Sequence, residues 1–317
     1  MKDEMSRRKF LRVTSSVAVG AGLTLATGRV FAGEGAKKAV LRKAIGLGMV
    51  AGKMPLDDKF KLVKDCGFEG VEVGTTNDEK QVALLKAAAE KAGVRIHSIM
   101  NSAHWSSPLS SPDPAVVEKG LACMKTSLRN AKAFGADAVL LVPTVVKPPV
   151  TQEEAWKRSQ ENIKTLIPLA QELNVRIGIE NVWNNFLTKQ DELVKYIDEF
   201  QSPFVCSYFD LGNYVKYGPP QDWIRALGSR IKKLHLKDFK TAVQKKKVTQ
   251  PDGTVVEKEE VGGSFVPLRE GSINWPEVRR ALDDIGYDGF MTAELKGGDE
   301  AYLKDVSARM DKIIAGE

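Results

Sequence analysis

The feature that most constrains this chain is an alternation of short apolar runs with longer helical patterns, repeated about eight times. The short runs have the length and composition of β-strands and lie at 43–48, 69–73, 94–100, 137–142, 175–180, 204–209, 231–236 and 289–294. The helical patterns lie near 56–66, 78–92, 114–134, 151–173, 188–200, 220–228, 275–285 and 299–315. Eight strand-helix units predict an α/β protein with one (β/α)8 TIM barrel, because each pair of parallel strands needs a crossover helix.

Several helical patterns also carry start and stop signals. Asn77 precedes the segment 78–92, and Gly93 and Gly135 follow two of the segments. An open, doubly wound sheet is the alternative arrangement of the same elements. The first strand-to-helix turn has no G-x-G-x-x-G motif, so a dinucleotide-binding fold has little support.

One connection is much longer than the others. A polar and charged insertion at about 240–270 follows the seventh strand, and "QPDGT" at 250–254 has the composition of a hairpin tip. In a barrel this insertion leaves from the carboxyl ends of the strands, where loops build active sites. Two alternatives stay open: a flap over a substrate, or a solvent-exposed decoration.

Residues 1–32 differ in character from the rest of the chain. A twin-arginine pair, Arg7 and Arg8, precedes a mildly apolar stretch that ends in small and aliphatic residues. This pattern predicts a Tat export signal cleaved after about Ala32, a mature domain of residues 33–317 and a periplasmic location. A retained membrane anchor is the alternative, but the apolar stretch is short for a spanning helix, which needs roughly 20 apolar residues.

The charge and cysteine content narrow the range of partners. Residues 1–32 hold six basic and two acidic side chains, so they carry four of the six formal positive charges and leave a nearly neutral mature chain. Nucleic acid is therefore not expected as a partner, and a small molecule is. Cys66, Cys123 and Cys206 are an odd set without close spacing, so we expect no required disulfide and mostly buried thiols.

Four consecutive strands end in a side chain that can bind a metal ion. Glu180 closes "IGIE", Asp210 closes "SYFD", His235 lies in "KLHL" and Glu294 closes "MTAE". The carboxyl ends of barrel strands share one face, so these side chains can converge. Three carboxylates and one imidazole suit one divalent ion such as Mn²⁺, Mg²⁺, Co²⁺ or Zn²⁺.

The chain resembles the xylose isomerase-like TIM barrels, and within them the branch of tagatose and psicose 3-epimerases. The motifs that carry the resemblance are "CGFEGVEV" at 66–73, "GIEN" at 178–181, "FDLGN" at 209–213, "HLKD" at 235–238 and "PLREGSINW" at 267–275. The resemblance implies that Glu180, Asp210, His235 and Glu294 bind one divalent metal ion. It also implies that Glu180 and Glu294 serve as the acid/base pair.

This resemblance implies a sugar isomerase or epimerase that removes a proton next to a carbonyl group, with the metal acting as a Lewis acid. The same proton abstraction on a 3-keto-glycoside makes a lyase or hydratase the first alternative. A non-catalytic periplasmic sugar-binding protein is the second. The sugar, the metal ion and the oligomeric state, including a homo-oligomer, stay open.

Further residues are expected around the mouth of the site. The 3-epimerases usually have a histidine where this chain has Asn213, and the arginine expected after the metal-binding histidine is absent, so Lys237 or Arg269 is expected to substitute for it. For Trp105 and Trp183, sugar stacking and packing stay open as alternatives, whereas His97 is expected to be structural. The complete set of expected substrate-binding residues is Glu72, Asn101, His104, Trp105, Trp183, Asn213, Lys237 and Arg269.

Overall fold

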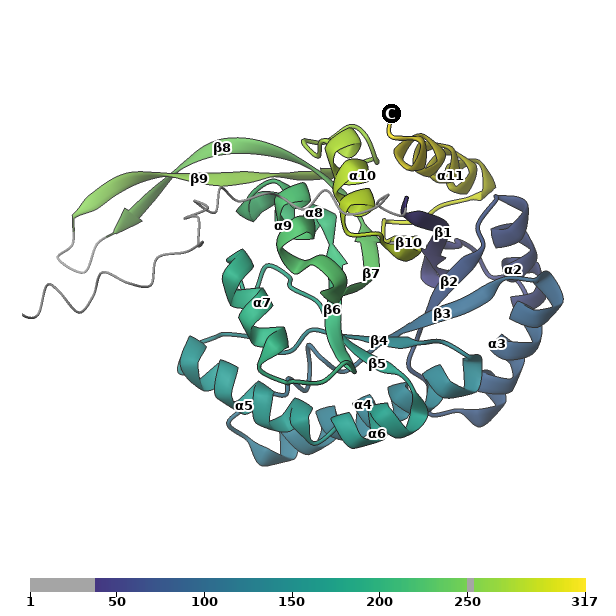
Figure 1. The fold of residues 1–317 in the computed structure, drawn as a ribbon, viewed down its shortest axis with the longest axis horizontal. Helices are drawn as coiled ribbons and strands as arrows, with labels where there is room; N and C mark the ends of the chain where they lie inside the picture. Colours follow the sequence, from purple (N-terminus) through teal and green to yellow (C-terminus); the bar gives the residue numbers. More distant parts are fainter. Residues whose placement is uncertain (1–37, 250–253) are drawn as a thin grey trace, which may run out of the picture. The chain divides into compact units, whose positions relative to one another are not determined.

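The structure is a computed structural model that describes residues 38–249 and 254–317. Eight parallel strands close into a barrel in the order β1-β10-β7-β6-β5-β4-β3-β2, with helices around the outside (Figure 1). These strands are β1 (Val40–Gly46), β2 (Gly70–Gly74), β3 (Arg95–Met100), β4 (Ala138–Leu141), β5 (Arg176–Ile179), β6 (Val205–Asp210), β7 (Ile231–Leu236) and β10 (Asp288–Ala293). The predicted (β/α)8 barrel is confirmed, and each apolar run overlaps one of its strands.

The helices also follow the predicted segments, apart from a break within 151–173 and an additional short helix at 211–214. They are α2 (Leu56–Asp65), α3 (Glu79–Ala92), α4 (Pro114–Phe134), α5 (Gln152–Lys164), α6 (Ile167–Leu173), α7 (Gln190–Asp198), α8 (Leu211–Tyr214), α9 (Pro220–Leu227), α10 (Trp275–Asp284) and α11 (Glu300–Ala315). The single helix predicted at 151–173 is wrong, because the chain forms α5 and α6 there. Pro168 has no N–H to donate to the carbonyl group of Lys164, and proline is accepted only in the first turn of a helix.

Local capping residues explain where two long helices begin and end. The side chain of Asp78 accepts a hydrogen bond from the backbone N–H of Lys80, so α3 is capped one residue after the predicted Asn77. Asp113 caps α4 in the same way. Gly93 and Gly135 end these helices in the left-handed conformation, which glycine adopts without steric cost. The sharp ends return the chain directly to the next barrel strand.

The insertion is a long antiparallel hairpin of β8 (Asp238–Thr249) and β9 (Val255–Val266), as predicted. The tip at 250–253 lies outside the described residues. The buried carboxylate of Asp238 fixes the base of the hairpin, because its Oδ2 accepts hydrogen bonds from the backbone N–H groups of Arg269 and Gly271 and from Trp275 Nε1, at 2.8, 3.1 and 3.1 Å. From this base the hairpin extends away from the barrel (Figure 1).

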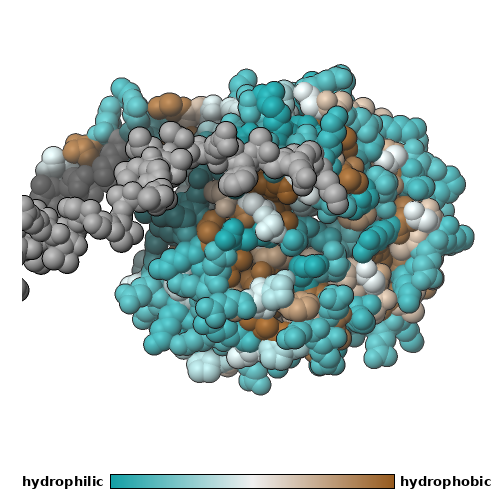
Figure 2. All heavy atoms as spheres, viewed as in Figure 1, coloured by the Kyte–Doolittle hydropathy of each residue, from teal (hydrophilic) through white to brown (hydrophobic). Residues whose placement is uncertain are grey.

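The face drawn in Figure 2 is mostly hydrophilic over the described residues, with hydrophobic side chains in small patches. Within residues 38–249 and 254–317, no helix combines the length and hydropathy that a membrane span requires. The predicted export signal at 1–32 lies outside the described residues. All three cysteines are free, with Cys66 and Cys206 buried and Cys123 partly buried, as expected.

Candidate metal centre

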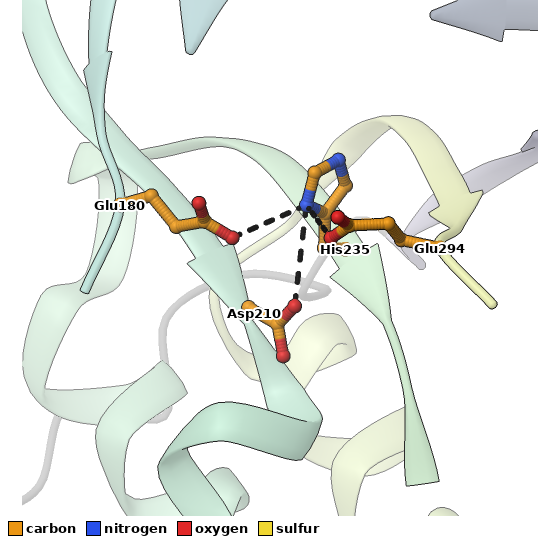
Figure 3. Close-up of side chains that lie close together, drawn as sticks. All are labelled: Glu180, Asp210, His235 and Glu294. Carbon is orange, nitrogen blue, oxygen red and sulfur yellow. Dashed lines mark hydrogen bonds and ion pairs between the residues drawn. The ribbon is translucent and has the colours of Figure 1, made fainter. Parts of the chain in front are cut away.

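Four side chains at the carboxyl ends of neighbouring strands meet in one place (Figure 3). Glu180 directly follows β5, and Asp210 is the last residue of β6. His235 lies in β7, and Glu294 directly follows β10. The four strands are adjacent, and the register of β6 and β7 pairs Asp210 with His235. One ligand atom from each residue therefore lies within 4.8 Å of those from the other three.

The Nδ1 atom of His235 is the centre of this cluster. It lies 2.8 Å from Glu294 Oε2, 3.3 Å from Glu180 Oε1 and 3.9 Å from Asp210 Oδ2. Figure 3 shows Glu180 and Glu294 reaching Nδ1 from opposite sides. His235, Asp210 and Glu180 are buried, whereas the Glu294 side chain is 32% exposed. The site is therefore accessible from the side of Glu294.

The donor atoms fit a divalent metal ion. Asp210 Oδ2 and Glu294 Oε2 are buried and accept no hydrogen bond from the described residues, which is unusual for buried carboxylate oxygens. Three oxygen donors and one nitrogen donor match the preferences of Mn²⁺, Mg²⁺, Co²⁺ and Zn²⁺. The four residues predicted as ligands are thus brought together in a form that can hold such an ion.

Lys237 is the cation nearest to the cluster. Its Nζ atom lies 3.0 Å from Asp210 Oδ2 and 2.7 Å from Glu294 Oε2, at ion-pair distance but outside hydrogen-bond geometry. Burial acts to lower the pKa of Lys237, but the charges of the surrounding carboxylates outweigh it and raise the pKa above its ordinary value. The ammonium group therefore remains positive and offsets part of the negative charge of the site.

The two glutamates occupy different electrostatic environments. Burial raises the pKa of Glu180 to about 7, against the opposing effect of His235. Burial also acts to raise the pKa of Glu294, but the charges of His235 and Lys237 reverse the effect and lower this pKa below its ordinary value. Two carboxyl groups with separated pKa values are the usual arrangement for an acid and a base that act on one substrate.

Glu72, expected to contact substrate, lies on the opposite side of the imidazole ring. Its Oε1 is 3.0 Å from His235 Nε2, and its Oε2 accepts hydrogen bonds from Tyr208 OH at 2.5 Å and Ser98 Oγ at 2.8 Å. Burial acts to raise the pKa of Glu72, but His235 and these hydrogen bonds lower it. Both oxygens are thus engaged inside the barrel, and the substrate contact expected for Glu72 stays a prediction. Tyr208 and Ser98 were not among the residues predicted around the site.

Three aromatic side chains predicted around the mouth differ in accessibility. His104 is buried with an unpartnered Nδ1 atom, and burial lowers its pKa to about 4, so its ring is neutral. Trp105 is 56% exposed and packs edge-on against His104. Trp183 is 41% exposed and stacks on Phe265 of the hairpin at 5.1 Å. Trp105 and Trp183 are therefore partly accessible to a ligand, whereas Nδ1 of His104 is enclosed.

The other predicted mouth residues hold local structure. Asn101 is buried, and its amide donates hydrogen bonds to Ser127 Oγ and Cys123 Sγ. Asn213 is buried, its backbone N–H donates to Asp210 Oδ1, and its amide donates to the carbonyl oxygen of Asn181. Arg269 is exposed, and in the described part of the chain no contact joins its guanidinium to the cluster. Of the two substitutes expected for the missing arginine, the structure thus places only Lys237 at the site.

A cavity of about 400 Å³ adjoins the cluster. Glu294 and Lys237 line it on one side. Its remaining wall comes from the base of the hairpin and from the segment that follows β10: Phe265, Val266, Pro267, Leu295, Lys296, Gly297 and Tyr302. This wall is mainly apolar. It was not predictable from the sequence, because its residues come from segments that are distant along the chain.

Comparison with known proteins agrees with the fold. The family model of the xylose isomerase-like TIM barrel matches residues 60–313. L-ribulose-5-phosphate 3-epimerase UlaE from Escherichia coli O1:K1 / APEC is 27% identical over 297 residues, which cover 86% of this chain and 98% of the relative.

Two solved structures share the fold. A D-tagatose 3-epimerase-like protein superposes with a TM-score of 0.69 at 17% identity, covering 86% of this chain and 98% of its own. A xylose isomerase-like TIM barrel protein from Mycobacterium smegmatis in complex with magnesium superposes with a TM-score of 0.64 at 18% identity, covering 87% and 97%. Because the family model spans most of the barrel, this chain belongs to the xylose isomerase-like TIM barrel family.

Proposed function

We propose that this protein is a divalent-metal-dependent sugar isomerase or epimerase that removes and returns a proton next to a carbonyl group. The observation that carries the proposal is the convergence of three carboxylates on Nδ1 of His235 at the carboxyl ends of four barrel strands. The similarity to curated 3-epimerases over most of the chain supports the same reaction class.

The proposed roles follow from the positions of the side chains. Glu180, Asp210, His235 and Glu294 would hold the metal ion, which when bound acts as a Lewis acid toward the substrate oxygens. Glu180 and Glu294 lie on opposite sides of Nδ1 (Figure 3), so one can remove a proton from one face of a substrate carbon and the other can return it.

Substrate binding would use the groups that remain accessible around the cluster. Trp105 and Trp183 are partly exposed, and sugar C–H groups pack well against aromatic rings. The positive charge of Lys237 can stabilise negative charge on a substrate oxygen.

Proton exchange with solvent tests this function directly. The purified protein is loaded with Mn²⁺ and incubated with a panel of ketoses in D₂O. After the protein has been removed, NMR identifies the carbon that has gained deuterium. We expect exchange at one carbon next to the carbonyl and loss of exchange in Glu180→Gln and Glu294→Gln. Tyr196→Phe is the matched control, because it removes a buried hydroxyl group that lies 2.8 Å from Ser159 Oγ. Exchange that persists in both glutamate variants would contradict the proposed roles.

One observation favours a second candidate, a lyase or hydratase acting on 3-keto-glycosides. The cavity beside Glu294 has room for a substituent on the sugar, and its wall is mainly apolar. After the same proton abstraction, the electron pair left on carbon would form a double bond as the glycosidic oxygen leaves with its own bonding pair. The same experiment separates the candidates: an epimerase gives a deuterated sugar, whereas a lyase gives an unsaturated ketone and the free aglycone.

We also propose that residues 1–32 direct Tat-dependent export to the periplasm. The support is the pair Arg7 and Arg8 followed by a mildly apolar stretch and small residues up to Ala32. Fused to a reporter protein, residues 1–32 should carry it to the periplasm of a Tat-competent bacterium. Changing both arginines to lysine should stop export, and a reporter that is exported equally in both forms would contradict the proposal.

A further inference from the structure

The two nitrogen atoms of the His235 ring face opposite sides. Nδ1 faces the metal-ligand cluster, whereas Nε2 lies 3.0 Å from Glu72 Oε1. Both side chains are enclosed by the barrel, with His235 at 0% and Glu72 at 3% exposure. Neither group can replace this contact with a hydrogen bond to bulk water.

Glu72 is itself held from two further strands. Its second oxygen, Oε2, accepts hydrogen bonds from Tyr208 OH at 2.5 Å and from Ser98 Oγ at 2.8 Å. These two hydroxyl groups are 3.0 Å apart, so they also contact each other. Residues from β2, β3 and β6 thus fix the plane of the carboxylate, and β7 supplies the ring that it faces.

The chemistry of this contact determines which nitrogen is free. An ionised carboxylate can only accept hydrogen bonds, so the nitrogen facing it must carry the proton. When a cation displaces the second proton of the ring, the lone pair that binds it lies on the other nitrogen, which here is Nδ1. A carboxylate behind a metal-bound histidine also increases the basicity of the ligand.

We infer that Glu72 is a positioning residue that holds the Nε2 proton of His235, fixes the ring plane and presents the Nδ1 lone pair to a divalent cation. Tyr208 and Ser98 act one step further away by orienting Glu72. The inference rests on the proposed metal centre and adds to it a buried support that touches neither substrate nor metal.

Metal affinity, measured by calorimetric titration of the full chain with Mn²⁺, tests this role. Glu72→Gln keeps the size of the side chain but removes its charge, and we expect affinity to fall by about 10- to 100-fold, the usual cost of losing such a partner. Tyr208→Phe should lower it less. Tyr196→Phe is the matched control, since Tyr196 is also fully buried and its hydroxyl lies 2.8 Å from Ser159 Oγ.

A second measurement reports the proton itself. In the zinc-loaded protein, ¹⁵N NMR of histidine should show Nε2 protonated and Nδ1 bound to metal for His235. In Tyr208→Phe the Nε2 proton should exchange faster with solvent, whereas in Tyr196→Phe it should not change. A purely structural role for Glu72 would alter unfolding but neither the signal nor the affinity.

The outcomes are distinguishable. If wild type binds no divalent ion, the proposed function fails. If wild type binds Mn²⁺ and folded Glu72→Gln binds it equally well, only the inference on Glu72 is overturned. If Glu72→Gln does not fold, Tyr208→Phe decides, because unchanged affinity and unchanged Nε2 exchange in that variant would overturn the inference.

Discussion

Two histidines inside the same barrel are equally buried, yet their surroundings favour opposite charge states. Burial acts to lower the pKa of His235, but the charges of Glu72 and Glu294 outweigh it and raise the pKa well above its ordinary value. For His97 in β3, burial and the positive charge of Lys233 act together and lower the pKa well below that value. Both rings have 0% exposure, so the difference lies in their neighbours.

The hydrogen-bond partners show why only one of the two rings is available to a ligand. Thr292 Oγ1 lies 2.9 Å from Nε2 of His97, Lys233 Nζ lies 3.3 Å from its Nδ1, and Phe290 stacks on the ring at 4.4 Å. Each nitrogen of His97 therefore has one partner of its own. Nδ1 of His235 instead faces three carboxylates that converge on it. The partners of the ring nitrogens, rather than the burial of the ring, therefore distinguish the candidate metal-binding histidine from the structural one.

The largest expected effect comes from removing the histidine of the metal centre. His235→Ala should weaken Mn²⁺ binding by more than about 100-fold, because losing an outer partner of a ligand already costs about 10- to 100-fold. Solvent exchange of substrate protons should stop. Calorimetry measures the Mn²⁺ affinity, and the deuterium assay measures the proton exchange. His97→Ala is the comparison, and its Mn²⁺ affinity should lie within about twofold of that of wild type. Similar metal binding in both alanine variants would break the comparison.

The second prediction concerns stability. His97→Ala leaves a cavity beside Phe290 and removes one partner each from Thr292 and Lys233 in the interior. We expect the free energy of unfolding to fall by about 3 kcal/mol, as for other truncations of buried rings and hydrogen-bonding groups. Urea unfolding of the metal-free protein measures this loss. A loss below about 1 kcal/mol would show that the ring is not a structural element.

The fold was predictable because the barrel repeats a simple unit. Apolar runs gave all eight strands, and glycines such as Gly93 and Gly135 marked the helix ends. The error at 151–173 arose because the helical period continues across the break, whereas the missing N–H of Pro168 ends the hydrogen-bond pattern. The hairpin was predictable from its turn residues, but its anchor at Asp238 depends on contacts with segments far along the chain.

The ligand cluster was predictable for a related reason, since topology alone brings the ends of adjacent strands together. The position of the Glu72 side chain was not predictable, because a glutamate at a strand end can face the mouth or the interior of the barrel. Ser98 and Tyr208 lie on the strands that supply its partners, and only the barrel register brings them to Glu72. The position of Arg269 was not predictable either, because it lies in a turn with φ of 73° that the sequence does not reveal.

The third prediction uses the pH dependence of stability. Burial and the charges of Lys233, His235 and Arg95 lower the pKa of His97 in the folded state, whereas in the unfolded state its pKa is the ordinary histidine value of about 6.5. Above this pH His97 is neutral in both the folded and the unfolded state, so its contribution to the free energy of unfolding is fully present. Below it only the unfolded state gains the proton, so wild type loses about 1.4 kcal/mol per pH unit from this group.

A variant without the imidazole isolates this contribution. His97→Gln cannot take up the proton, so the stability difference between wild type and His97→Gln should shrink as the pH is lowered from 6.5 to 5. Urea unfolding of the metal-free proteins at several pH values measures the difference. A difference that stays constant over this range would mean that His97 accepts a proton in the folded protein.

The smallest effect tests whether the two histidine environments are separate. Thr292 is paired in register with His235 in the adjacent strand, but its hydroxyl group contacts His97 Nε2 and also hydrogen-bonds to Tyr208. Thr292→Val keeps the shape of the side chain and removes these contacts. We expect a loss of about 1 kcal/mol in unfolding free energy, the typical contribution of one hydrogen bond.

Metal affinity in the same variant decides the comparison. Thr292 lies two contacts away from Glu72, through Tyr208, so Thr292→Val should weaken Mn²⁺ binding by less than about threefold, well below the effect expected for Glu72→Gln. Calorimetric titration of both variants under the same conditions gives the ratio. The opposite result would be that Thr292→Val weakens Mn²⁺ binding as much as Glu72→Gln does. In that case one hydrogen-bond network would connect His97 to His235 through Thr292, Tyr208 and Glu72. The structural and the metal-binding histidine would then not be independent.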